Sequence, residues 1–480
     1  MSETLVPEVE MSQKPMDWSK LLSSKRIGNG KPVRSDGRRP YQVDLDRIVF
    51  SQPFRRLQDK TQVHPLSPND HVRRRLTHSI EVASIGRSLG TLVGPAIINR
   101  YNLRRSPADF GYILQAACHA HDIGNPPFGH LGEDAIRDWF RNNEKGLRDD
   151  GFKMVELQWK DLKTFEGNAQ GFRILVETEK HKGRNGLNLT YATLGAYMKY
   201  PNCVGDHPGG KEKFGYYQSE CKRAEDVANE LGLGVHAREK GWRRPPLAFL
   251  LEAADDISYA IVDIEDGIEL GILSLEEVVE HLRPLIPKAS AFWSIEDTRQ
   301  NERARREALR GDAIGTLIEE ASHAFINHER EMREGSFLVQ KDGEEEIENG
   351  IDRPYREIMD CIEHHGIFRA AQEMAVQRVF GHHSKATKEF ASFRIIERLL
   401  SAFTLPLREL AKSGSKKRLT RRAEQIVSIM GNTGAEMLDS WKRQDDKARH
   451  YQALRRVVDY VSGMTDGYAS SLYRQLEGLA

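Results

Sequence analysis

Apolar residues recur every three or four positions along most of the chain, which is the spacing of one face of an α-helix. The longest such run follows Pro245 and Pro246 and continues for about five helical turns. Its members are Leu250, Ala254, Ile257, Ile261, Ile264 and Ile268. A single stripe of this kind predicts a long helix that buries one face against the rest of the protein.

A second helix is predicted from Pro107 toward Gly124. Ser106 is a suitable N-cap, proline is favoured at the first helical position, and Asp109 stands where an acidic residue closes a capping box. Apolar residues follow at helical spacing at positions 110, 113, 114, 117 and 118. Gly124 comes after the last of them, where glycine commonly ends a helix.

The pattern predicts an all-α protein, because no two strand-like runs are joined by turn residues. Residues 1–40 are expected to form a flexible leader, residues 41–275 the main domain, and residues 276–480 a helical C-terminal region. Segments 181–190 and 201–215 are rich in Gly, Asn and Lys and are predicted loops.

Composition is typical of a soluble globular protein, with 39% hydrophobic and 30% charged residues. Lys plus Arg and Asp plus Glu number 71 each, so an anionic ligand must be held by local basic clusters. The four cysteines are scattered without a C-x-x-C pair, which argues against a thiolate zinc site and a disulfide scaffold. No membrane-spanning run and no signal-peptide pattern is found, so a cytoplasmic protein is expected.

Three separated polar stretches contain residue types that bind a divalent cation such as Mg2+ or Mn2+. His78 begins an apolar helical row and His121 continues the apolar face of its own helix, so both imidazoles are expected to point toward a core. Asp122 follows near a helix C-terminus, where the helix dipole favours a cation. Asp255 shares one face of the long helix with Tyr259. On chemistry alone, two interpretations stay open: a metal site, or a solvated acidic face with structural core histidines.

Longer motifs surround these residues. They are RRRLTHSIEVASIGRSLG, HAHDIGNPPFGHLGE, FEGNAQGFRIL, GLNLTYATLGAYMKYP and EAADDISYAIVDIED, with DLDRIVFSQPFRRLQDKTQV upstream. The pattern H…HD…D resembles the HD superfamily of metal-dependent phosphohydrolases. The longer motifs resemble the deoxyguanosine triphosphate triphosphohydrolase family, in order, over about residues 40–270. The resemblance implies a multi-helix HD-domain fold with a helical C-terminal extension.

The resemblance also implies the residues of an active site. The metal ligands, for Mg2+ or Mn2+, would be His78, His121, Asp122 and Asp255. Asp255 is preferred to Asp256 because the family's ligand stands four residues before a tyrosine, here Tyr259. His130 and Glu133 would take the acid/base role. The substrate-binding residues would be Arg75, Lys199, Tyr200, Tyr259, Asp263, Gln62, Val63 and Asn168.

The implied reaction is hydrolysis of a deoxynucleoside triphosphate (dNTP), foremost dGTP, at the α-phosphorus, giving a deoxynucleoside and tripolyphosphate. It needs a positioned water, cations that neutralise the phosphates and a proton donor for the leaving oxygen. The ring of Tyr259 against C2′ would exclude a ribose hydroxyl, and Asp263 would accept a hydrogen bond from the 3′-hydroxyl. The alternatives are an HD-type nucleotide phosphatase or phosphodiesterase, and a nucleotide-sensing or nucleic-acid-binding protein with a silent site.

Asn125 departs from the family pattern, because many relatives have there a histidine, which can take a proton. The basic run Lys412–Arg422 is open to two interpretations: a contact for single-stranded nucleic acid or an allosteric nucleotide, or an exposed helix start. The histidine pairs at 364–365 and 382–383 lack matching carboxylates and are expected to be surface or core residues. Since the family commonly assembles, a homo-oligomer is expected.

Overall fold

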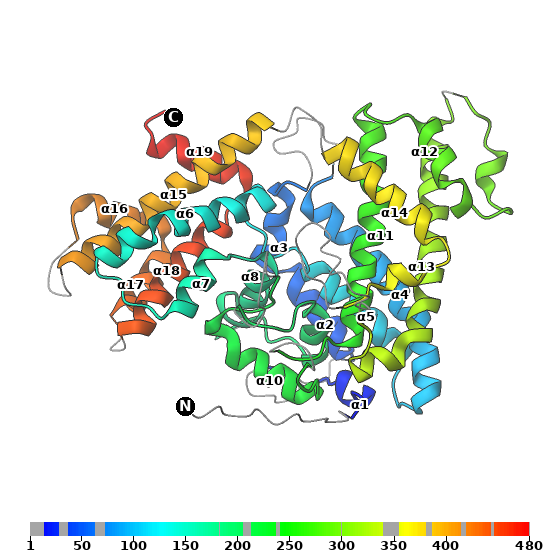
Figure 1. The fold of residues 1–480 in the computed structure, drawn as a ribbon, viewed down its shortest axis with the longest axis horizontal. Coiled ribbons are helices and arrows are strands. Elements are labelled where there is room, and N and C mark those ends of the chain that lie inside the picture. The colour runs from blue at the N-terminus through cyan, green and yellow to red at the C-terminus, as the bar shows by residue number, and fades with distance from the viewer. Residues whose placement is uncertain are drawn as a thin grey trace, which may run out of the picture.

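The computed structural model describes residues 14–27, 37–62, 73–181, 183–204, 213–236, 241–298, 300–338, 355–380, 386–413, 419–442 and 446–479. Within these ranges the protein is built almost wholly of helices (Figure 1). The only strands in the described ranges are β1 (Lys180–His181) and β2 (Arg184–Asn185), which pair as a short antiparallel hairpin. The predicted all-α fold is therefore confirmed.

The first part of the chain contains the helices that surround the predicted site. They are α1 (Trp18–Leu21), α2 (Pro40–Val49), α3 (Gln52–Arg56), α4 (Arg75–Tyr101), α5 (Pro107–Ala120), α6 (His130–Asp149), α7 (Glu156–Lys163), α8 (Gly167–Arg173), α9 (Tyr191–Tyr197), α10 (Cys221–Leu231) and α11 (Pro246–Glu269). Short 3-10 turns are η1 (Leu57–Asp59) and η3 (Gln218–Glu220), and η2 (Ile174–Thr178) is a π-helical turn.

The second part of the chain continues with helices. They are α12 (Leu275–Leu282), α13 (Glu302–Glu334), α14 (His365–Met374), α15 (Ala386–Ser413), α16 (Arg421–Met430), α17 (Asn432–Trp441), α18 (Asp446–Ser462) and α19 (Asp466–Leu476). The short turns are η4 (Arg283–Leu285), η5 (Ala291–Ser294), η6 (Ile358–Cys361) and the π-helical η7 (Ala375–Phe380).

Both helices predicted in detail are present. The long helix α11 begins at Pro246, and most of its side chains are buried because it packs against α4, α5 and α13. Helix α5 begins at Pro107, and the backbone N–H of Ser106 donates to Asp109 Oδ2 at 3.1 Å, as a capping box requires. The prediction for the end of α5 is wrong, because the helix stops at Ala120. A Cβ on Gly124 would lie 2.1 Å from a backbone nitrogen of α8, so this glycine permits the close approach of α8.

Helices α4 and α5 pack backbone to backbone. A Cβ atom on Gly90 of α4 would lie 2.6 Å from the carbonyl oxygen of Phe110 and 2.8 Å from the backbone nitrogen of Gly111, both in α5. Only a residue without a side chain fits at this contact. The antiparallel pair consequently brings the N-terminal turn of α4, with His78, beside the C-terminal end of α5, where His121 follows.

The expected flexible leader is wrong for residues 14–27. Trp18 is 1% exposed and Leu22 is fully buried. Trp18 Nε1 donates to Glu329 Oε1 at 2.5 Å, and the backbone N–H of Met16 donates to the carbonyl oxygen of Arg333 at 3.0 Å. Hydrogen bonds thus hold this segment to the distant helix α13, while α1 packs against α9 and α10, and its local sequence reveals none of these partners.

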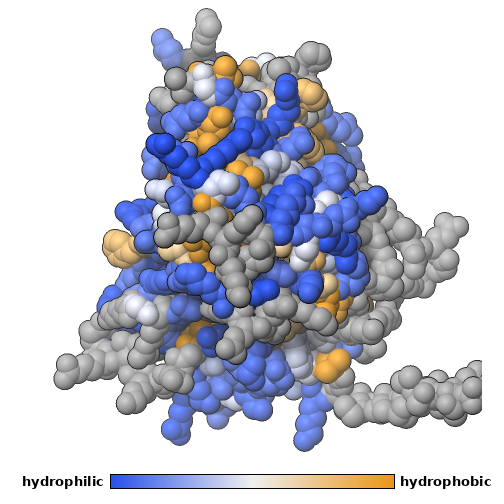
Figure 2. All heavy atoms as spheres, turned by 90° about the vertical axis from the view of Figure 1, so that its left-hand side faces the viewer, coloured by the Kyte–Doolittle hydropathy of each residue, from blue (hydrophilic) through white to orange (hydrophobic). Residues whose placement is uncertain are grey.

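The C-terminal helices α15–α19 form one end of the molecule, where α15 packs against α6, and α12–α14 lie toward the other end (Figure 1). Figure 2 shows the face over the C-terminal helices, which is mostly hydrophilic with small scattered apolar areas. Their apolar stripes therefore face inward, as in an ordinary globular protein. No helix in the described ranges has the length and apolar character that crossing a membrane requires.

Candidate active site

A polar cavity of about 340 Å³ lies between α4, α11, the start of α6 and the turn that follows α5. It collects residues that are far apart in sequence. The residues lining it are Thr61, Gln62, Arg75, His78, His121, Asp122, Asn125, Phe128, Gly129, His130, Leu131, Glu133, Glu166, Asn168, Lys199, Tyr200, Lys213, Leu251, Asp255 and Tyr259. Most of the residues predicted for an active site therefore share one cavity.

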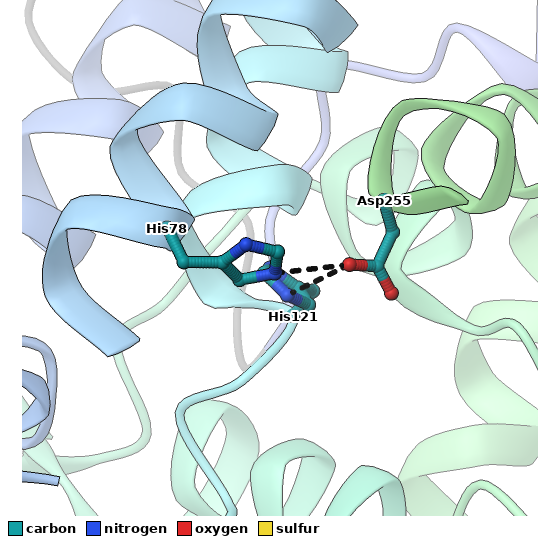
Figure 3. Close-up of side chains that lie close together, drawn as sticks. All are labelled: His78, His121 and Asp255. Carbon is teal, nitrogen blue, oxygen red and sulfur yellow. Dashed lines mark hydrogen bonds and ion pairs between the residues drawn. The ribbon is translucent and has the colours of Figure 1, made fainter. Parts of the chain in front are cut away.

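His78, His121 and Asp255 converge in this cavity (Figure 3). Asp255 Oδ1 lies 3.1 Å from His78 Nε2 and 3.5 Å from His121 Nε2. The three donor atoms lie within 4.8 Å of one another, which is close enough for a single ion to bind all of them. Each donor comes from a different helix or helix end, so the group exists only in the folded protein.

The donor atoms of this group suit a divalent cation. His121 Nε2 is buried and makes no hydrogen bond within the described part of the chain. His121 Nδ1 lies 2.6 Å from the carbonyl oxygen of Cys118, which orients the ring so that Nε2 faces the cavity. Burial raises a carboxyl pKa, but the neighbouring His121 and His78 outweigh burial and hold the pKa of Asp255 below its usual range. An anionic carboxylate and an unpartnered imidazole nitrogen are what Mg2+ or Mn2+ accepts.

Asp122, the fourth predicted ligand, lines the same cavity but is turned toward other partners. Its Oδ2 lies 3.5 Å from His121 Nε2 and accepts a 2.7 Å hydrogen bond from Arg75 Nη1. Asn125 Nδ2 donates to its Oδ1. Burial alone would raise the pKa of Asp122, but the charge of Arg75 outweighs it and lowers that pKa. The structure thus brings three predicted ligands into one group and places the fourth beside them.

His130 and Glu133 form a hydrogen-bonded pair at the start of α6. His130 Nδ1 lies 3.0 Å from Glu133 Oε2, and the His130 side chain is 79% exposed while that of Glu133 is 2% exposed. The backbone N–H of Gly167 donates to Glu133 Oε1 at 2.7 Å. Burial opposes the anion, but the hydrogen bond with His130 and the charges of Lys213 and Arg137 outweigh it, so the pKa of Glu133 lies well below its usual range. A fixed carboxylate thus orients an imidazole that reaches the solvent side of the cavity.

The predicted phosphate-binding residues also face the cavity. Arg75 is 5% exposed, and its Nε makes no hydrogen bond within the described ranges. Lys199 Nζ lies 3.1 Å from Glu252 Oε1 and 5.7 Å from the centre of the Tyr200 ring. Burial lowers a lysine pKa, but Tyr200 and Glu252 outweigh it and raise the pKa of Lys199. Two positively charged side chains therefore line the cavity.

The residues predicted to hold sugar and base are divided. Gln62, Asn168 and Tyr259 line the cavity, whereas Val63 lies outside the described residues. Asp263 is 1% exposed, lies one helical turn beyond Tyr259 and is not among the residues that line the cavity. Burial raises the pKa of Asp263 to about 8, which favours its neutral form.

Sequence reasoning missed Lys213 and Glu166. Lys213 Nζ lies 3.1 Å from Glu166 Oε2, and both residues line the cavity near Glu133. Glu166 stands in the motif FEGNAQ, which was read only for Asn168. Lys213 lies in a predicted loop without a motif, so no local signal marked it.

The described residues of the remaining polar motifs do not line the cavity. Arg421 begins α16 with Thr420 as N-cap, which agrees with a helix start at the end of the basic run, and residues 414–418 lie outside the described ranges. His364 Nδ1 lies 2.5 Å from Glu320 Oε1, and His365 Nδ1 lies 2.9 Å from a backbone carbonyl oxygen. The pair at 382–383 lies outside the described residues.

The helical fold and the convergent His-His-Asp group define the class of protein. Residues 75–182 match the HD domain, and residues 407–475 match the phosphohydrolase-associated domain. The protein is therefore an HD-domain hydrolase, a class that depends on a bound metal.

Relatives align with nearly the whole chain. A deoxyguanosinetriphosphate triphosphohydrolase-like protein of Pseudomonas aeruginosa (strain PAO1) is 39% identical over 96% of this chain and 99% of its own length. A protein of the same name from Synechocystis sp. is 36% identical over 97% of this chain and 100% of its own length. A deoxyguanosinetriphosphate triphosphohydrolase of Enterobacter sp. (strain 638) is 31% identical over 91% and 94%. The chain belongs to the deoxyguanosinetriphosphate triphosphohydrolase-like family.

Proposed function

We propose that the protein hydrolyses a dNTP, foremost dGTP, to a deoxynucleoside and tripolyphosphate. One observation carries this proposal: a single cavity combines the His-His-Asp group, the His130–Glu133 pair and the cations of Arg75, Lys199 and Lys213. The names of the relatives agree with it, since they are triphosphohydrolases or proteins like them.

His78, His121 and Asp255 would hold Mg2+ or Mn2+, with Asp122 beside them. The bound ion would supply a Lewis acid for a phosphoryl oxygen and a water made more acidic by coordination. Arg75 Nη1 donates a 2.7 Å hydrogen bond to Asp122 and so holds that carboxylate in place. Arg75 Nε has no hydrogen-bond partner among the described residues and is still able to donate to a ligand. It is therefore placed to contact a phosphate as well as to orient a ligand.

Lys199, Lys213 and Arg75 would bind the triphosphate. A nucleoside triphosphate carries three to four negative charges at neutral pH, and positive groups on several sides of a cavity balance such a chain. A monophosphate or a cyclic nucleotide has too few charged oxygens to contact all three cations at once, whereas a triphosphate can. This distribution of charge favours the triphosphohydrolase over the phosphatase or phosphodiesterase alternative.

His130 would protonate the 5′-oxygen when its bond to the α-phosphorus breaks. Its Nδ1 is held by Glu133 at 3.0 Å, so Nε2 is the atom left to face a substrate. Glu133 stabilises the protonated imidazole because the carboxylate is buried and anionic. Water adds its hydroxyl to the α-phosphorus as the bond to the 5′-oxygen breaks, the proton from His130 completes the deoxynucleoside, and the second proton of the water is released to solvent, from which His130 is protonated again.

Tyr259 would select deoxyribose. Its side chain lines the cavity one helical turn from Asp255, so its ring can pack against C2′ of a sugar whose α-phosphate lies at the metal group. A 2′-hydroxyl would meet the ring and lose its hydrogen bonds to water. Asp263 is the proposed partner of the 3′-hydroxyl, and its Oδ2 makes no hydrogen bond within the described ranges.

The test is a product analysis with each of the four dNTPs and GTP, in Mg2+ or Mn2+, by ion-exchange chromatography. Deoxynucleoside with intact tripolyphosphate, absent in the Asp122→Ala variant, supports the proposal. Orthophosphate or pyrophosphate as product would place the cleavage elsewhere and refute it. Absence of turnover with single nucleotides is followed by dNTP mixtures, because an activating nucleotide is part of the proposal.

Further partners and the location of the protein are also proposals. We expect a homo-oligomer, an activating nucleotide or single-stranded nucleic acid, and a cytoplasmic location. We also propose that the chain divides into a domain of residues 41–275 and a C-terminal region of residues 276–480. Light scattering with and without dGTP measures the oligomer directly.

A further inference from the structure

The C-terminal helix α19 begins beside the active-site cavity. Its first residue, Asp466, is 3% exposed although α19 lies at the surface end of the molecule (Figure 1). The carboxylate accepts hydrogen bonds from three donors. Asp466 Oδ2 accepts from the backbone N–H of Thr61 at 3.0 Å and from the Thr61 hydroxyl, and Oδ1 accepts from the backbone N–H of Phe128 at 2.9 Å.

Both partners of Asp466 belong to walls of the cavity. Thr61 lines it next to Gln62, and Phe128 lines it two residues before His130. Phe128 has a φ of 66°, a left-handed conformation that a bulky side chain rarely adopts. The surrounding structure must hold such a residue in place, and the hydrogen bond from its N–H to Asp466 is one of the restraints.

Lys60 forms a second connection between the same parts. Its Nζ donates to the carbonyl oxygen of Asn125 and, at 2.9 Å, to the carbonyl oxygen of Ser462 at the end of α18. The side chain is buried, with 2% of the residue exposed. The segment around Thr61, the turn 125–129 and the α18–α19 junction are therefore joined by buried polar contacts on both sides of the turn.

We infer that Asp466 is a positioning residue for the proposed reaction, because it joins two walls of the cavity from outside the HD domain. Residue 466 lies within the phosphohydrolase-associated domain at 407–475, whereas the HD domain spans 75–182. The C-terminal region thereby sets the place of His130 without contacting the substrate. This inference rests on the proposed function for its kinetic test and on geometry alone for its structural test.

Asp466→Asn is the informative substitution. The asparagine side chain has only one acceptor oxygen, so it can accept a hydrogen bond from Thr61 or from Phe128 but not from both. Its NH2 group then faces the N–H of the other residue, which is also a donor. We expect kcat for dGTP in Mn2+ to fall about tenfold or more, the range for losing a charge-assisted hydrogen bond. KM should change less than threefold, about 0.65 kcal/mol, because the cations around the triphosphate are untouched. Asp439→Asn is the control, since Asp439 is 75% exposed at the end of α17.

Amide hydrogen exchange separates positioning from general stability. We expect faster exchange at residues 125–130 in Asp466→Asn, with exchange in the rest of the chain and the thermal midpoint close to those of the Asp439→Asn control. Mn2+ binding by isothermal titration should be unchanged, because the metal group lies on α4, α5 and α11. Unchanged kcat, or unchanged exchange at 125–130, overturns the inference.

The two proposals fail in different ways. If the wild type hydrolyses none of the dNTPs, the proposed function fails, and the exchange experiment still decides whether Asp466 holds the turn. If the wild type is active and Asp466→Asn keeps its kcat, the positioning role alone is wrong. Should Asp466→Asn not fold, Thr61→Val removes only the hydroxyl donor, and an unchanged kcat in that variant overturns the inference.

Discussion

Replacing Glu133 by glutamine tests the proposed proton donor directly. The carboxylate uses both oxygens: Oε1 accepts from Gly167 N–H at 2.7 Å, and Oε2 lies 3.0 Å from His130 Nδ1. Arg137 Nη2 also lies 3.4 Å from Oε2. Glutamine keeps one oxygen, so the bond to Gly167 or the bond to His130 is lost, and an NH2 group then faces another donor.

The expected loss follows from the strength of one bond. A hydrogen bond to a charged group contributes about 1.5–3 kcal/mol. Because about 1.4 kcal/mol corresponds to a tenfold change in rate, Glu133→Gln should lower kcat about 10- to 150-fold. His130→Ala removes the proton donor itself and should cost about 100- to 10,000-fold.

The assay is steady-state release of tripolyphosphate from dGTP between pH 6 and 9, with Mn2+ affinity and the thermal midpoint measured alongside. Asp134→Asn is the matched control, because Asp134 is the next residue of α6, is 49% exposed and pairs with the same Arg137 at 2.9 Å. If Glu133→Gln matches this control in kcat, Glu133 does not support His130 and its part in the acid/base role is wrong.

Three further predictions concern the metal group, helix packing and pH. Asp255→Asn should weaken Mn2+ binding by at least about 10–100-fold in isothermal titration. Asp256→Asn should not weaken it, because burial raises the pKa of Asp256 well above its usual value and the amide then replaces a neutral group. Equal Mn2+ affinities in the two variants would refute the assignment of Asp255 as the ligand. Gly90→Ala should destabilise by about 1–3 kcal/mol in urea, since its Cβ meets a backbone oxygen at 2.6 Å, whereas Gly311→Ala, with open space around it, should stabilise by about 0.5–1 kcal/mol. Burial raises the pKa of Asp161 to about 7, so the folded state keeps a proton that the unfolded state releases near pH 4. The contribution of this proton to the free energy of unfolding is complete below pH 4 and is lost as the pH rises through 7. Asp161→Asn should therefore gain stability relative to the wild type between about pH 4 and 7, by up to about 1.4 kcal/mol per pH unit, and a pH-independent difference would contradict this.

Local patterns in the sequence determined the helices and most of the chemistry. Capping at Ser106 and Pro107 and the apolar stripe of α11 depend on neighbouring residues, so their spacing was enough to predict both starts. The motifs around His78, His121 and Asp255 identified the donors that the fold brings together, because each motif is a continuous segment. Their likeness to a known family led to the proposed metal and substrate, which spacing alone left open.

The tertiary structure decided which residues meet, because those contacts join segments that are far apart along the chain. Lys213 pairs with Glu166, and Asp466 accepts from Thr61. Trp18 donates to Glu329, which lies 311 residues further along the chain. No local spacing in the sequence encodes such pairs. Gly90 shows the same limit, since a glycine inside a helix pattern reads as a weak position until the backbone of α5 is found against it. Long-range packing selects the surroundings of each side chain, and those surroundings set its charge, its partners and its part in the site.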